Sequence, residues 1–144
     1  MRSDFLAALF ACVAALSSGC YPSNVLAVRD RAVAIGAEDG AQWRTCAIAD
    51  LSGYFESYAV DGDAALSLRK VYYLFVPGGR YTGAALVESD EGASFQTLGG
   101  AWSMDAAGLS LDGAPPVRCE VADGGLLRIS LEGGAISLRK VEVR

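Results

Sequence analysis

From residue 51 onward, apolar and polar positions alternate in short runs that are separated by glycine-rich turns. The runs recur roughly every 8 to 12 residues, which is the spacing typical of an all-β sandwich or barrel. No stretch in this span carries the apolar period of a helix. We therefore expect an all-β chain that folds as a small antiparallel meander β-barrel.

The most strongly apolar pair of runs lies within residues 71–87 and is joined by Pro-Gly-Gly at 77–79. Proline presets the backbone angle of the first central turn position, and glycine accepts the positive φ that closes the loop. This loop length places Phe75 opposite Tyr81 and Tyr73 opposite Gly83. The residues predicted to face the core from this hairpin are Tyr73, Phe75, Tyr81, Ala85 and Val87.

Further strands are expected on both sides of this hairpin. The predicted strands are 54–60, 66–76, 95–104, 109–111, 117–121, 127–131 and 136–143, with turns at 61–63, 105–108, 123–125 and 132–134 and a charged connection at 88–93. Pro115 and Pro116 mark a break, because proline cannot donate a hydrogen bond to a sheet. Trp102 is expected to fill the barrel interior or to close one of its ends.

Residues 60–71 and 131–141 repeat one pattern, an acidic glycine turn followed by a strand that ends in Arg-Lys-Val. Each contains apolar residues three positions apart: Leu68 and Val71 in the first, and Leu138 and Val141 in the second. Such residues cannot share a face of a regular strand, so a bulge is expected in each. The basic pairs are interpreted either as a site for an anionic headgroup or as solvent-facing charges that protect strand edges.

The first 19 residues have the layout of a secretory signal peptide. Arg2 precedes an apolar run at 5–16 that is too short to span a bilayer permanently. Small residues then lead to Cys20, and this ending resembles a bacterial lipobox, in which the cysteine is acylated and becomes N-terminal. Because Ser17 replaces the usual aliphatic residue, ordinary signal-peptidase cleavage is the alternative. We expect a membrane-anchored envelope lipoprotein that faces the periplasm or the cell surface.

Residues 20–42 are expected to tether the anchor to a barrel domain at 43–144. Apolar residues at near-helical spacing lie between Asn24, a potential helix cap, and Gly36, a potential helix stop. The same run is rich in β-branched residues, so a strand is the alternative to a short helix.

The cysteines divide between the leader and the barrel. Cys12 leaves with the signal peptide in this interpretation, and Cys20 carries the lipid. Cys46 and Cys119 remain as one pair in an oxidising compartment, where a disulfide is expected. Two buried free thiols are the alternative. The spacing is unlike that of a zinc site, which needs cysteines a few residues apart.

Charge and composition exclude several classes of function. The net charge of -5 argues against nucleic acid as a partner, because that contact needs clustered Lys and Arg. Histidine is absent, which removes Ser-His and Cys-His nucleophiles and the commonest transition-metal ligand. Asp61 and Asp63 are more typical of turn formation than of paired-carboxylate catalysis. We therefore predict no enzyme, no catalytic residue, no metal and no cofactor.

The aromatic and glycine positions of residues 51–143 resemble those of small bacterial lipocalin-like lipoprotein domains. The shared features are Tyr73 and Phe75, a Pro-Gly turn, Tyr81 to Gly83, Gly100, Trp102, Leu109 and Leu111. The resemblance implies a meander barrel that either holds an apolar ligand or is filled by its own side chains. The residues assigned to such a ligand site are Tyr73, Phe75, Tyr81 and Trp102.

The sequence thus favours a non-enzymatic envelope lipoprotein whose barrel binds a small apolar ligand or a protein partner. The alternative is a structural or inhibitory interaction module without a small-molecule ligand. In that interpretation, Glu88, Asp90 and Glu91 form an acidic contact surface among the loops.

Overall fold

The computed structural model describes residues 38–142. The expected signal peptide, Cys20 and the potential helix at 24–36 lie outside these residues. The strands are β1 (Arg44–Thr45), β2 (Gly53–Gly62), β3 (Leu68–Val76), β4 (Arg80–Ser89), β5 (Gly92–Asp105), β6 (Gly108–Leu111), β7 (Cys119–Ala122), β8 (Leu126–Leu131) and β9 (Gly134–Val141), and the short 3-10 helices are η1 (Ile48–Asp50) and η2 (Asp63–Leu66). No helix in the described part of the chain is long and apolar enough to cross a membrane.

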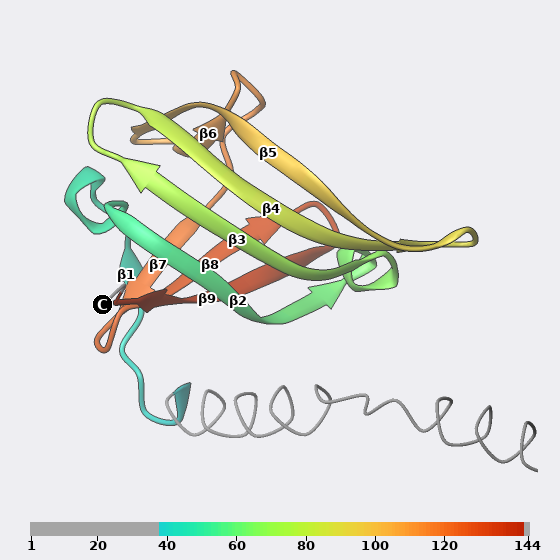
Figure 1. Ribbon diagram of the computed structural model, residues 1–144. Helices are drawn as coiled ribbons and strands as arrows, with labels where there is room; N and C mark the ends of the chain where they lie inside the picture. The colour runs from blue at the N-terminus through green and yellow to red at the C-terminus, as the bar shows by residue number, and fades with distance from the viewer. Residues whose placement is uncertain (1–37, 143–144) are drawn as a thin grey trace, which may run out of the picture.

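The strands form one curled antiparallel sheet in the order β1-β7-β8-β9-β2-β3-β4-β5-β6 (Figure 1). The two ends of the curl meet where β6 reaches the segment before β7. There Leu109 and Val117 exchange backbone N–H···O bonds of 2.9 and 2.8 Å. β1 pairs with β7 itself, C-terminal to this contact. The predicted all-β fold, a small antiparallel barrel, is confirmed.

The central hairpin has the predicted register. Phe75 pairs with Tyr81, Tyr73 with Gly83, and Val76 with Arg80. Gly78 and Gly79 adopt φ values of 103° and 82°, which a side chain would oppose, and this explains why the loop needs glycine at both positions.

Two connections differ from the prediction. The predicted turn at 61–63 is largely strand, because Asp61 and Gly62 continue the pairing of β2 with β9; helix η2 then replaces the predicted start of the next strand. The predicted charged connection at 88–93 is also mostly strand. β4 and β5 remain paired as far as Ser89 and Gly92, so only Asp90 and Glu91 form the turn. The charged residues did not mark the ends of β4 and β5, because both faces of these strand ends are exposed and charged side chains are accommodated there.

One of the two predicted bulges is present. In β3 the register shifts between Leu68 and Lys70, which leaves Arg69 as the extra residue. The bulge predicted in β9 is wrong, because the extra residue lies on its partner β2, at Tyr58. Because β9 is therefore regular, Lys140 lies on the inner side of the sheet, opposite Phe55 of β2.

The β2 bulge coincides with the point where β2 separates from β3. The ladder between these strands ends at Glu56, and the buried Ser57 hydroxyl then accepts a 2.9 Å hydrogen bond from the Val71 N–H. A side chain thus satisfies a buried backbone donor that the ladder no longer reaches.

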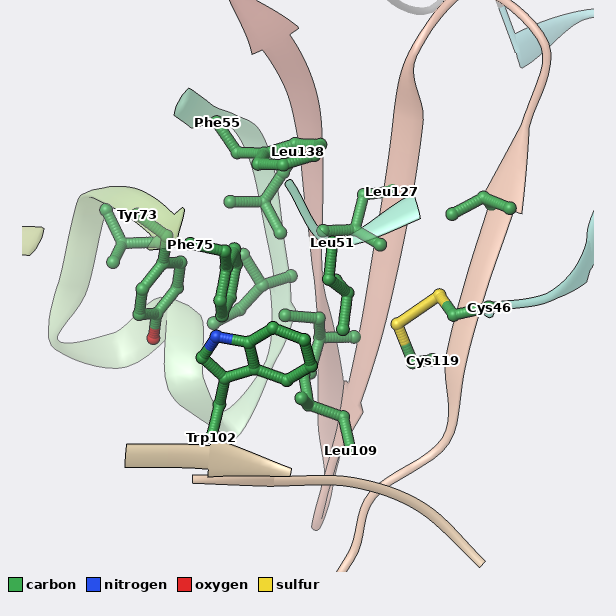
Figure 2. Packing of buried hydrophobic residues seen from close by; sticks show 14 of the residues in the cluster. Cys46, Leu51, Phe55, Tyr73, Phe75, Trp102, Leu109, Cys119, Leu127 and Leu138 are labelled. Carbon is green, nitrogen blue, oxygen red and sulfur yellow. A yellow bond between two sulfur atoms is a disulfide. The ribbon is translucent and has the colours of Figure 1, made fainter. Parts of the chain in front are cut away.

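The inner faces of the strands form one hydrophobic core (Figure 2). Its largest fully buried side chains include Phe75, Leu51, Leu109, Leu127, Leu138 and Val71. A disulfide joins Cys46, which follows β1, to Cys119 of β7, with the Cα atoms 5.4 Å apart. The predicted pairing of these two cysteines is confirmed. The bond ties the N-terminal end of the described chain to the strand at which the barrel closes.

Candidate functional site

The four side chains assigned to an interior ligand site lie together in the barrel. Ring centroids are 5.4 Å apart for Tyr73 and Phe75, 6.0 Å for Tyr73 and Tyr81, and 6.0 Å for Phe75 and Trp102. Phe55 adds a further ring, 6.0 Å from Phe75. Edge-to-face and offset contacts at such distances are the arrangements that aromatic rings prefer. The cluster therefore packs as a core.

Trp102 lies at the barrel end that is capped by the β3–β4 loop. Its indole Nε1 donates to the carbonyl oxygen of Arg80 at 3.0 Å, and its backbone N–H donates to that of Gly79 at 2.8 Å. Figure 2 shows the indole beside Phe75 and Leu109. Trp102 thus lies inside the barrel and also helps to close one end.

Tyr81 reaches from the aromatic cluster to the surface. Its hydroxyl donates to Asp112 Oδ2 at 2.7 Å, and the backbone N–H of Ala101 donates to Asp112 Oδ1 at 2.9 Å. Burial and the hydrogen bond to Asp112 raise the pKa of Tyr81 to about 12. The same two donors lower the pKa of Asp112 below its usual value, which keeps this carboxylate ionised at neutral pH.

The structure therefore brings Tyr73, Phe75, Tyr81 and Trp102 together, as the sequence predicts. Phe75 is 1% exposed and Trp102 8%. These side chains contact one another, and at this end of the barrel they occupy the interior themselves. Ligand binding by these residues stays a prediction.

A second concave region, absent from the sequence prediction, lies where the β7–β8 turn faces η1 and the end of β9. This recess has a volume of about 270 Å³, and its lining includes Arg44, Asp50, Phe55, Gly125 and Lys140. The ammonium group of Lys140 lies 5.9 Å from the centroid of the Phe55 ring. Sequence reasoning missed the recess because it depends on Lys140 facing inward, which follows only once β9 is known to be regular.

The charges at the mouth of the recess are partly compensated. Arg44 donates to Asp50 through both terminal nitrogens, at 2.7 and 2.8 Å. The hydrogen bond from Arg44 lowers the pKa of Asp50, and a bond from the Ala47 N–H acts in the same direction. The recess thus places the Lys140 ammonium group near a ring that is itself only 2% exposed, and Asp50 and Asp123 add two carboxylates to its lining.

The repeated basic pairs lie mostly against carboxylates. β3 and β9 flank β2, and Glu56 between them contacts Lys70 at 3.4 Å and Arg139 at 2.5 Å. Arg69 pairs with Glu88 at 2.5 Å. These contacts favour a structural role for the basic pairs over a headgroup site.

The chain enters the barrel across its outer surface. Glu38 accepts hydrogen bonds from Tyr58 and Arg128, and the Arg128 guanidinium lies 4.1 Å from the centroid of the Trp43 ring. Burial, followed by the contact with Glu38, raises the pKa of Tyr58. The end of the expected tether is thus attached to β2 and β8.

The three residues of the predicted acidic surface have different surroundings. Glu88 is paired with Arg69, whereas Asp90 and Glu91 form the turn at the tip of the β4–β5 hairpin. Within residues 38–142 there is no cluster of three or more His, Cys, Asp or Glu that could hold a metal ion.

Comparison with known proteins gives one partial similarity. No family model matches the chain, and no curated protein matches it. A solved structure described as a lipocalin-like protein from Bacteroides uniformis is 21% identical, covers 64% of this chain and 99% of that chain, and superposes with a TM-score of 0.38.

Proposed function

We propose that this protein is an exported envelope lipoprotein, anchored through Cys20, whose barrel is a rigid scaffold for contacts with other proteins. Export and the anchor rest on the leader sequence. The disulfide between Cys46 and Cys119 is compatible with an oxidising compartment outside the cytoplasm. The absence of histidine from the sequence supports a non-enzymatic role.

The observation that carries this proposal is the packing of the aromatic cluster. A barrel of about eight strands is just wide enough for large side chains to fill it. Tyr73, Phe75 and Trp102 are at most 9% exposed and contact one another through their rings. A ligand in this part of the barrel would have to displace them, so the functional contacts are assigned to the outside.

Quenching of Trp102 fluorescence tests this proposal. The sequence contains two tryptophans, so Trp43→Phe leaves Trp102 as the only reporter. The mature chain is placed in phosphatidylcholine vesicles and titrated with a brominated fatty acid, which quenches only on close approach. We expect no saturable quenching. Stoichiometric, saturable quenching with Phe75 intact would mean that an apolar ligand enters the barrel, and the scaffold proposal would fail.

A second candidate function rests on the recess beside Phe55 and Lys140. Its volume of about 270 Å³ and the Lys140 ammonium group in its lining suit a short-chain carboxylate. Calorimetric titration with octanoate tests this candidate, with Lys140→Ala as the variant that should lose the heat of binding. No binding by the unmodified chain would remove the candidate and leave the scaffold proposal intact.

A further inference from the structure

Strand β5 has an open edge along most of its length. It pairs with β4 from Gly92 to Ala101, whereas on its other side it pairs with β6 only from Trp102 to Asp105. Among the residues that the structure describes, none is paired with residues 92–100 on that side. The β4–β5 hairpin extends past the other strands (Figure 1). Its open edge is therefore accessible to another strand.

Asp112 fixes where the open edge begins. The backbone N–H of Ala101 donates to Asp112 Oδ1 at 2.9 Å, and the carbonyl oxygen of Ala101 accepts from the Asp112 N–H at 2.8 Å. Both backbone groups of Ala101 thus point away from β4. Since backbone direction alternates along a strand, the same groups of Ala93, Phe95, Thr97 and Gly99 also point away from β4.

The open edge lacks the features that usually prevent pairing. Exposed edges are commonly protected by charged residues, by proline or by being very short. Residues 92–104 contain no charged residue and no proline. The opposite edge of the sheet, by contrast, is β1, which has only two residues and includes Arg44.

One large apolar side chain is exposed on the outer face of the sheet beside this edge. Phe95 is 70% exposed, and its cross-strand neighbour on β4 is Leu86. Leu74 and Val76, which are 39% and 42% exposed on the same face, lie level with Gly99 and Ala101 and therefore away from Phe95. Phe95 is thus the exposed apolar side chain that a strand added at this edge would lie beside.

We propose that the open edge of β5 is a self-association site, at which a second copy of this chain adds its own β5 antiparallel about a two-fold axis at Phe95. This inference rests on the proposed function only in placing the contacts outside the barrel. A second copy is the occupant because this edge is complementary to itself. The outward N–H groups of one copy can donate to the outward C=O groups of the other, and no like charges are opposed along residues 92–100.

The register follows from the outward-facing residues. With Phe95 opposite Phe95 of the second copy, Ala93 lies opposite Thr97, and both are hydrogen-bonded pairs. The two exposed phenyl rings then cover each other across the axis, which buries the most exposed aromatic surface of the hairpin. Ala101 lies beyond the paired segment in this register, so Asp112 can keep both of its contacts there. A shift that centred on Thr97 would instead oppose Ala93 to Ala101, whose backbone groups are already used.

Disulfide trapping in membranes of the producing cell tests the site with the full chain in place. Opposed residues of a hydrogen-bonded antiparallel pair have Cα atoms about 5.5 Å apart, within the range that a disulfide spans. Phe95→Cys should therefore give a covalent dimer on a non-reducing gel. Leu74→Cys, on the same outer face but two strands from the edge, is the matched control and should give at least tenfold less.

A mixed pair tests the register. Chains with Ala93→Cys and chains with Thr97→Cys, produced together, should cross-link more than either chain alone, because these positions face each other only between copies. Peptide mapping of the Cys46–Cys119 bond verifies that each variant is folded. If Phe95→Cys cross-links no more than Leu74→Cys, and the mixed Ala93→Cys and Thr97→Cys pair, which keeps Phe95, cross-links no more than either chain alone, the self-association proposal is overturned, and another protein or the residues before Glu38 remain as occupants. The quenching of Trp102 is read separately, so failure here is distinguishable from failure of the scaffold proposal.

Discussion

Phe75 lies directly opposite Tyr81 in the β3–β4 hairpin, with ring centroids 6.2 Å apart, and Phe75 is the most completely buried of the aromatic side chains in residues 38–142. Arg80 is the neighbour of Tyr81 in sequence but points to the other face of the same ribbon. The two faces of one hairpin thus differ sharply in how much packing each side chain contributes.

Phe75→Ala should lower the free energy of unfolding by about 3 to 5 kcal/mol, because it deletes a buried ring that contacts Phe55, Tyr73 and Trp102. Arg80→Ala is the matched control and should change stability by no more than about 0.5 kcal/mol. Urea midpoints compare the two variants. A larger loss for Arg80→Ala would contradict the inward assignment of this face.

The disulfide between Cys46 and Cys119 closes a sequence separation of 73 residues. Its reduction should cost about 2 to 4 kcal/mol, mainly by freeing the unfolded chain. Urea unfolding with and without reductant measures this cost. The double variant Cys46→Ala/Cys119→Ala is the control and should not respond to reductant. Equal midpoints for the oxidised and reduced chain would show that the bond does not stabilise the barrel.

Asp112 should make stability depend on pH in the acid range. Its pKa is lower in the folded chain because Tyr81 and the Ala101 N–H donate to the carboxylate. Its stabilising contribution is therefore complete above the unfolded-state pKa, near 3.8, and is lost as the pH falls through the lower folded-state value. Asp112→Asn should flatten the fall in urea midpoint below pH 3.8. Parallel pH curves for the variant and the unmodified chain would refute this role.

Cys20→Ala should move the protein from the membrane to the soluble fraction, because Cys20 is the expected site of acylation at the end of the leader. Fractionation followed by detection of the chain measures the change. Cys12→Ala is the control and should leave the protein in the membrane. An unmodified chain that is already soluble would contradict the anchor.

The parts of the fold that could be predicted are those set by local chemistry. The Pro-Gly-Gly loop determined the register of β3 and β4, and the alternation of Leu127 and Ile129 identified one face of β8. The cysteine pair followed from counting, because Cys12 was assigned to the leader and Cys20 to the lipid anchor.

The features that could not be predicted depend on contacts between distant segments. At the β2 bulge, the Ser57 hydroxyl accepts from the Val71 N–H and Glu38 accepts from the Tyr58 hydroxyl, and both contacts are with segments distant in sequence. Because this bulge is on β2, β9 is regular, and Lys140 therefore faces inward. The open edge near Phe95 exists because Asp112 ends the pairing of β6, and no pattern within β5 reports this.

The most direct test of the account is the mass of the mature protein extracted from membranes, measured first under native conditions and then after denaturation. We predict a denatured mass that corresponds to a chain starting at Cys20 with its acyl groups. We also predict that the native mass per chain is the same, because the aromatic cluster around Phe75 occupies the barrel interior. An unacylated chain, or a small molecule that is present at one per chain in the native protein and lost on denaturation, would contradict the account of an anchored scaffold.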